Sequence, residues 1–117
     1  MTSLVACIGE GRGTIAHVAK LLQESWEQVY VIMQPAFRDS FRPDAKNVSI
    51  IEVDISKTVP ELTAFLAKEF DGKFFGDVCV NLISGTGKEH MAIMAALLKS
   101  GAGIRLVSLT QDGMKEI

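Results

Sequence analysis

Two glycine-containing loops carry the residue types that bind phosphate. They span Gly9 to Thr14 and Ser84 to Lys88, and each follows a short apolar run and precedes a helix-like pattern. Backbone N–H groups of such a loop, together with the positive end of the following helix dipole, form an anion site. Arg12 and Lys88 add a cation beside each loop. The sequence therefore predicts a small, local anion site.

Neither loop matches a familiar nucleotide motif. In the first loop the third glycine comes one residue early, and Thr14 occupies its expected place in the dinucleotide fingerprint. The second apolar run also ends in Gln34 instead of an acidic residue for a ribose hydroxyl. The second loop has Leu82 where a P-loop needs its first glycine, and Glu89 where it needs Ser or Thr. We therefore predict no dinucleotide cofactor and no hydrolysis of nucleoside triphosphates.

The pattern of apolar residues alternates between buried strands and amphipathic helices. Continuous apolar runs or alternation predict strands at Leu4–Ile8, Val29–Met33, Val48–Ile55, Val78–Ile83 and Ile104–Leu109. Apolar residues at spacings of three and four predict helices at Thr14–Ser25, Ser56–Phe70 and Lys88–Lys99. Strands separated by such helices predict an α/β fold: a Rossmann-like three-layer sandwich with a mainly parallel sheet of about five strands. We expect residues 1–117 to form one domain, in which the loops at the carboxyl ends of the strands bind the ligand.

Composition narrows the classes of partner. The 117 residues are 48% hydrophobic and carry a net charge of −2, which disfavours binding along a long nucleic acid. The longest apolar run, Met91 to Leu98, is far shorter than the roughly 20 residues of a membrane helix, and no signal peptide is evident, so we expect a cytoplasmic protein without membrane contact. Cys7 and Cys79 lie in strand-like runs, where we expect reduced core residues, with a disulfide as the less favoured alternative. No cluster of residues has the spacing of metal ligands, so we predict no metal.

Each loop also has a purely structural interpretation. Gly11 and Gly13 would then form a tight turn, and Ser84 and Thr86 would cap the helix that follows them. Two such loops at one sheet edge, each with a cation, favour ligand binding. Asn81 is an unusual residue for a buried strand, and it either bonds a neighbouring loop, braces the Ser84 turn or reaches the ligand.

Histidines are not the expected source of acid–base chemistry. His17 lies beside the apolar stripe of the first predicted helix, and His90 lies in the first turn of the third. For both we favour a solvated or capping role over catalysis.

The run Asn81-Leu82-Ile83-Ser84-Gly85-Thr86 resembles the Asn-x-Thr-Ser-Gly-Thr or Thr-Gly-Gly-Thr-Lys element of CRISPR-associated Rossmann-fold (CARF) domains. The chain is similar to them also in its size and in its first strand, which ends in a glycine-bearing loop. It differs at Ile83, where the family usually has Thr or Ser, and in the order Gly85-Thr86-Gly87-Lys88, which can displace the hydroxyl and the ammonium group. The resemblance implies a cyclic oligoadenylate ligand, formed during type III CRISPR interference, and a twofold homodimer.

Three functions follow from these observations. The first is a sensor domain that binds the ring at a homodimer interface. The second is a metal-independent ring nuclease, in which Lys88 stabilises developing charge, Ser84 or Thr86 orients the phosphate, and Arg12 or Glu10 contributes from the first loop. The third is a Rossmann-like domain for another phosphorylated ligand, or for none. The predicted ligand-binding residues are Gly9, Glu10, Gly11, Arg12, Gly13, Thr14, Asn81, Ser84, Gly85, Thr86, Gly87 and Lys88.

The third predicted helix bears on the homodimer. Met91, Ile93, Met94 and Leu97 give it more apolar surface than one face against the sheet needs. Either both sides pack within the monomer, or the second side contacts a partner copy.

Overall fold

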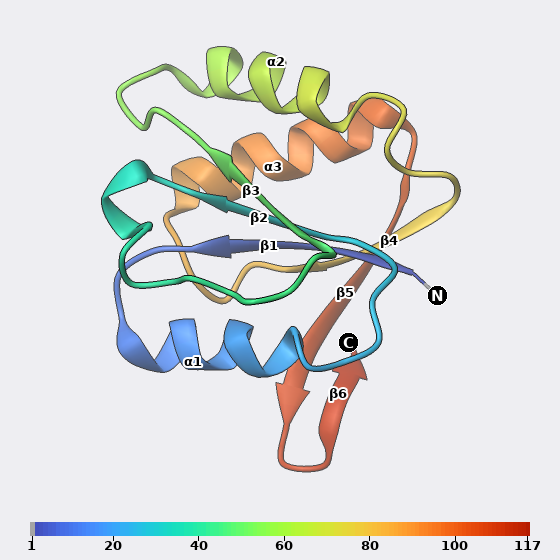
Figure 1. Cartoon of the computed structure of the whole chain (residues 1–117). Coiled ribbons are helices and arrows are strands. Elements are labelled where there is room, and N and C mark those ends of the chain that lie inside the picture. Colours follow the sequence, from blue (N-terminus) through green and yellow to red (C-terminus); the bar gives the residue numbers. More distant parts are fainter. Residues whose placement is uncertain (1) are drawn as a thin grey trace.

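The computed structural model describes residues 2–117 and consists of a six-stranded sheet covered by helices on both faces. The strand order is β3-β2-β1-β4-β5-β6, and every pair is parallel except β5 with β6. Figure 1 shows α1 on one face of the sheet and α2 and α3 on the other. This arrangement confirms the predicted α/β sandwich.

The strands and helices alternate along the chain. The strands are β1 (Ser3–Ile8), β2 (Val29–Met33), β3 (Val48–Glu52), β4 (Asp77–Asn81), β5 (Gly103–Thr110) and β6 (Gly113–Glu116). The helices are α1 (Arg12–Leu21), α2 (Val59–Phe70) and α3 (Gly87–Ser100), and a 3₁₀ turn, η1 (Pro35–Phe37), follows β2.

The sheet separates two hydrophobic clusters. Alternate residues of β1 point to opposite faces, so Leu4 and Ala6 pack with α1, whereas Val5 and Cys7 pack with α2 and α3. Both cysteines are free and buried, as expected for core thiols. The central strands are buried on both faces because helices cover both, which explains their continuous apolar runs.

Helix boundaries differ from the predicted ones where side chains satisfy helix ends. α1 ends at Leu21 instead of Ser25, and the indole N–H of Trp26 donates to the Leu21 carbonyl at 2.7 Å. α2 begins at Val59 instead of Ser56 because Thr58 and Glu61 form a capping box, with Pro60 in the first turn. α3 ends at Ser100 and is followed by Gly101, whose φ of +79° is the left-handed conformation expected of a glycine at a helix C-terminus.

Two predicted strands end earlier than expected, and one strand was not predicted. β3 ends at Glu52 instead of Ile55, and β4 ends at Asn81 instead of Ile83. β6 was not predicted, because Gly113–Glu116 is short and lacks a run of apolar residues. It pairs with β5 in an antiparallel hairpin that projects beyond the rest of the sheet in Figure 1.

The carboxyl ends of β1 to β4 define the edge at which a ligand would bind. The first turns of α1, α2 and α3 all lie at this edge, on the left in Figure 1. Among residues 2–117, no helix combines the length and the apolar character that crossing a membrane requires.

Candidate functional site

The loops after β1 and β4 are in direct contact. The Gly9 N–H donates to Ser84 Oγ at 2.8 Å, and a Cβ atom on Gly9 would lie 2.6 Å from Gly85 Cα. Gly85 has a φ of +102°, and its own Cβ would lie 2.5 Å from Cys7 Sγ. Only glycine allows this approach of two backbones over the end of β1. The two predicted loops therefore form one junction at the carboxyl edge.

Ser84 holds this junction together from within. Its side chain is only 2% exposed, and its Oγ lies 3.3 Å from Thr14 Oγ1 in addition to the Gly9 contact. Its hydroxyl is therefore not open to a ligand, in contrast to the phosphate-orienting role expected for it. Nor does it cap α3; of the two expected capping residues, Thr86 alone does so.

The first turn of α3 is satisfied by its own side chains. The Thr86 N–H donates to Glu89 Oε1 at 2.9 Å, and the Glu89 N–H donates to Thr86 Oγ1 at 3.4 Å, which completes a capping box. Glu89 is 1% exposed, so its carboxylate is fixed at the positive end of the helix dipole. The sequence of this helix start resembles a phosphate-binding loop, but the Glu89 carboxylate already occupies the positive end of the α3 dipole.

The first turn of α1 has no such partner. Gly11 is its N-terminal capping residue with a φ of +103°, and no side chain caps the helix. The turn contains no acidic residue, and Arg12 is exposed at its start. The N–H groups of a first turn have no acceptor within their own helix. Of the three α-helix starts described at this edge, the α1 start is therefore the one that no side chain caps.

Lys88 lies across the edge toward β3. Its Nζ donates to the Ile55 carbonyl at 2.7 Å, and the side chain is half-buried. The ammonium group forms a fixed cation between α3 and the segment after β3.

Asn81 braces the turn after β4. Its Oδ1 accepts from the Ile83 N–H at 3.2 Å, and its Nδ2 donates to the Val107 carbonyl at 2.9 Å. The side chain is buried, so it supports the loop rather than reaching its surface. Of the alternatives considered for this residue, the structure shows the bracing role.

The solvated or capping role expected for His17 is wrong. His17 Nε2 lies 3.2 Å from Asn81 Nδ2 and accepts from the Leu109 N–H, also at 3.2 Å. The ring thereby joins α1 to β4 and β5. The signal for this contact was a buried amide in β4 that needed partners, but the sequence does not show which helix supplies them.

His90 is part of the loop junction. Its Nε2 lies 2.7 Å from the Ser84 carbonyl, to which the ring N–H donates. The half-buried ring therefore fixes the backbone just before α3.

Cys7 lies beneath the junction and is protonated at neutral pH. Burial raises the pKa of its thiol, and the negative charge of Glu89 raises it further. Although these groups are neighbours, no donor has hydrogen-bonding geometry toward Glu89 Oε2 among residues 2–117. A neutral buried thiol is not a nucleophile. Within the same residues, no group of three or more His, Cys, Asp or Glu side chains is placed to hold a metal ion.

An apolar groove begins at the turn after β4. It has a volume of about 400 Å³, and the apolar side chains of Ile83, Met94, Leu106 and Ile117 line it. On α3, Ile93 and Leu97 are fully buried, whereas Met91 is exposed. The helix thus keeps apolar surface on its outer side, next to the loop junction.

The predicted site residues thus divide into two groups. The structure brings both loops together: Arg12 and the α1 start are open, whereas Ser84 and Asn81 hold the loops from inside. Glu89, which was not among the predicted site residues, caps α3 beside them. No family model matches the chain, and no curated protein matches it.

Proposed function

We propose that this chain binds a cyclic oligoadenylate at the interface of a homodimer and acts as a sensor in type III CRISPR immunity. The observation that carries the proposal is the first turn of α1, which no side chain caps, where Arg12 is exposed and which follows directly on the loop that contacts Ser84. Free N–H groups, a helix dipole and a guanidinium group together favour a phosphate.

A ring ligand agrees with the small size of this site. The chain has a net charge of −2. Binding a symmetric ring does not need a broad basic face, because the ring presents similar phosphates to two copies of one loop. The resemblance of residues 81–88 to the CARF element supplies the identity of the ring. Within residues 81–88, Asn81 Oδ1 accepts from the Ile83 N–H and so braces the turn.

The apolar groove supports a second copy of the chain as the partner. Its lining includes Ile83, which precedes Ser84 of the loop junction, and a twofold contact along the groove would bury this apolar lining between two copies. Leu106 and Ile117 are exposed at the edge of this groove, at 40% and 78%. Burying such side chains between copies removes apolar surface from water.

Binding without cleavage is favoured over a ring nuclease. Cys7 carries a neutral thiol, Ser84 is buried, and the His17 Nε2 already accepts hydrogen bonds from the protein. Lys88 is likewise engaged with the Ile55 carbonyl. These side chains hold the loops, which suits a preorganised binding site.

The test is incubation with labelled cyclic tetra-adenylate and cyclic hexa-adenylate, followed by gel shift and chromatography. We expect retention of an intact ring. Conversion to linear products ending in a 2′,3′-cyclic phosphate would instead favour the ring nuclease. Absence of a shift with both rings would contradict both, and would leave a different phosphorylated ligand.

The homodimer is tested separately by sedimentation with and without the ring. We expect Leu106→Glu to shift the protein toward monomer and to weaken ring binding. Phe75→Glu is the matched control, because Phe75 is 93% exposed and does not line the groove. Equal sedimentation of the two variants would contradict the use of the groove.

A further inference from the structure

The two edges of the sheet differ in how they are protected. β6, at one edge, carries the exposed charged residues Lys115 and Glu116. β3, at the other edge, has the uncharged run Ser49-Ile50-Ile51 at its centre. Charged side chains and prolines discourage an edge strand from pairing with another chain. The centre of β3 has neither.

The outer side of β3 presents unpaired backbone groups. The Asn47 carbonyl and the Val53 N–H both bond to β2, at 2.8 and 2.9 Å. Because successive residues of a strand direct their N–H and C=O groups to opposite sides, Ile50 and Glu52 direct theirs away from β2. Among residues 2–117, these outward groups have no hydrogen-bond partner. The edge can therefore accept a further strand.

Hollows lie beside β3 on both faces of the sheet. On the α1 face, a hollow of about 500 Å³ has an apolar lining of Phe41, Val48 and Ile50. On the α2 face, a hollow of about 390 Å³ is lined by Leu62 and by Phe65, whose side chain is 42% exposed. The side chains of an added strand point alternately to the two faces, so both hollows would receive them.

The start of β3 is basic. Lys46 is exposed directly before the strand, and Arg38 and Arg42 line the hollow on the α1 face. Asp39 also lines this hollow and pairs with Arg42. Lys46 and Arg38 have no ion-pair partner among residues 2–117. This end of the strand therefore favours an acidic partner.

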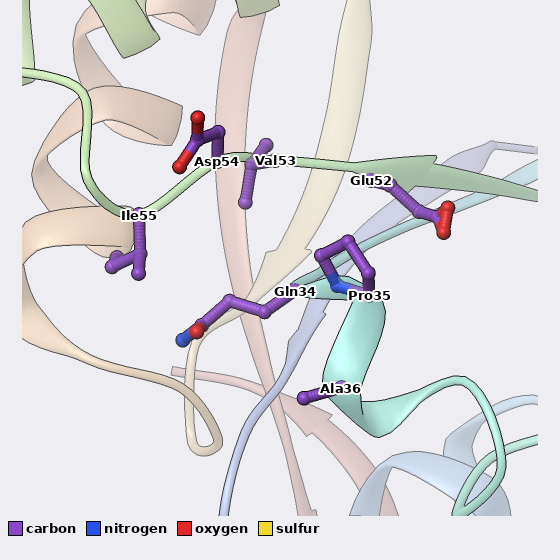
Figure 2. Close-up of a pocket in the computed structure, with 7 residues that line it drawn as sticks. All are labelled: Gln34, Pro35, Ala36, Glu52, Val53, Asp54 and Ile55. Carbon is purple, nitrogen blue, oxygen red and sulfur yellow. The ribbon is translucent and has the colours of Figure 1, made fainter.

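The end of β3 is acidic. Glu52 and Asp54 are exposed, and Figure 2 shows their carboxylates pointing away from Gln34. Asp54 Oδ1 accepts from the Ser56 hydroxyl at 2.7 Å and from its N–H at 3.0 Å, which lowers the pKa of the Asp54 carboxyl and keeps it charged at neutral pH. A strand with a basic start and an acidic end is complementary to an antiparallel copy of itself.

A twofold axis beside Ile50 gives the register of such a pair. With Ile50 opposite Ile50 of a second copy, the outward groups of these two residues exchange hydrogen bonds. The same register sets Val48 of one copy opposite Glu52 of the other, which brings Glu52 beside the arginine-lined hollow. It also sets Lys46 opposite Asp54. Opposite charges facing each other across paired strands are stabilising.

We infer that β3 is an interface at which two copies of the chain join their sheets edge to edge as antiparallel strands. The inference goes beyond the proposed function, because the apolar groove lies at β4, β5 and α3, from which β2 and β1 separate β3. The contact through β3 does not need the ring. Chains that use both contacts form assemblies of more than two copies.

The first test uses Leu106→Glu, which places a charge in the groove and so leaves the β3 contact to be measured by itself. We expect the average mass from sedimentation equilibrium to rise with protein concentration, from monomer toward dimer. Adding Ile50→Pro removes an outward N–H and no bond to β2, and this double variant is expected to stay monomeric. A constant monomer mass of Leu106→Glu, or an equal rise in both proteins, would overturn the inference.

The second test follows amide hydrogen exchange in Leu106→Glu and needs no substitution in β3. The amides of Ile50 and Glu52 are expected to exchange at least about tenfold more slowly at concentrations where the dimer predominates. The amides of Ser49 and Ile51 face β2 and are the matched control, with equal rates at both concentrations. Unchanged exchange at Ile50 and Glu52 while the mass rises would overturn the inference, also if Ile50→Pro fails to fold.

The third test addresses the register. Lys46→Asp is expected to raise the dimer dissociation constant of Leu106→Glu about tenfold, because two attractive pairs become repulsive. Adding Asp54→Lys is expected to restore association. Lys99→Asp, at an exposed lysine in the last turn of α3, is the matched control and should associate as before. Equal association of Lys46→Asp and Lys99→Asp, or no recovery in the charge swap, would overturn the antiparallel pairing.

The two interfaces fail independently. If Leu106→Glu and Phe75→Glu sediment equally, the groove contact is wrong, and concentration-dependent protection of the Ile50 amide still supports the β3 contact. If the Ile50 amide shows no such protection, the β3 contact is wrong and the ring-binding homodimer stands. Protection of Ile50 only after a different protein is added would assign the edge to that partner and overturn the inference.

Discussion

The first turns of α1 and α3 lie at the same edge of the sheet, after the neighbouring strands β1 and β4, yet they satisfy their N–H groups differently. Thr86 and Glu89 cap α3 with groups of the chain itself. No side chain caps α1, and Gly11 and Gly13 leave its first turn uncovered. A helix that provides its own carboxylate gains stability, whereas one that leaves this position open can bind a foreign anion.

This difference between the two helix starts reverses the ranking of the two loops as phosphate sites that the residue types alone favoured. Ser84 to Lys88 is the better match to a phosphate loop and contains the lysine, but Ser84 and Glu89 are buried and Lys88 is engaged with Ile55. In the proposed function, this loop is therefore mainly the support, and the α1 start is the binding position.

Separating the two helix starts should have the largest effect. Gly9→Ala places a Cβ 2.6 Å from Gly85 Cα, so the loops must move apart, at a cost of about 1–3 kcal/mol in the free energy of unfolding. Gly13→Ala is the control, because a Cβ there meets nothing within 4 Å and should stabilise α1 by up to about 1 kcal/mol. Urea denaturation measures both, and an equal effect of the two variants would contradict the contact between loops.

Providing α1 with its own carboxylate should make it resemble α3. Gly13→Glu is expected to stabilise the fold by about 1 kcal/mol, through helix propensity and the dipole. It should also weaken binding of cyclic tetra-adenylate at least about tenfold, since two negative groups would compete for one position. Gly13→Gln provides the uncharged control, and it should keep most of the affinity. Equal binding by the two variants would place the phosphate elsewhere.

Removing the cap of α3 should affect stability and not binding. Thr86→Ala loses the capping contacts with Glu89, which costs about 1 kcal/mol in the free energy of unfolding. Ring affinity should stay within about twofold if the phosphate binds at α1. A loss of affinity larger than the effect of Gly13→Glu would reverse the roles of the two helix starts.

The smallest expected effect is on the pH dependence of stability. The Cys7 thiol beneath the junction has a pKa raised above its ordinary value of 9.0, so the unfolded chain releases this proton at lower pH than the folded chain. The free energy of unfolding should therefore fall as the pH rises from 8 to 9.5, by less than about 1 kcal/mol from this group. Cys7→Ala should show a smaller fall than the unmodified chain, and an equal fall would mean that the thiol is not buried.

Periodicity was sufficient to predict most of the fold. The central strands and all three helices are continuous apolar runs or stripes, because each buries a face against the sheet. β6 was missed because a short edge strand such as Gly113–Glu116 takes its structure from pairing with β5, which no local pattern indicates.

The candidate site could be predicted in place but not in detail. Glycines after β1 and β4 indicated two loops at one edge, since parallel strands end together. The sequence could not show that Ser84 faces Gly9, that Lys88 reaches Ile55, or that His17 bonds Asn81, because these contacts span distant parts of the chain. The same limit applies to the open edge of β3, because only the strand order shows which strands lie outermost.

The most direct measurement is a titration of the whole chain with cyclic tetra-adenylate, followed through backbone amide chemical shifts. The predicted result is that the amides of Arg12, Gly13 and Thr14 shift strongly, while those of Lys88 and Glu89 shift little. The opposite pattern, with large shifts at the α3 start and none at α1, would contradict the claim that the uncapped helix holds the phosphate.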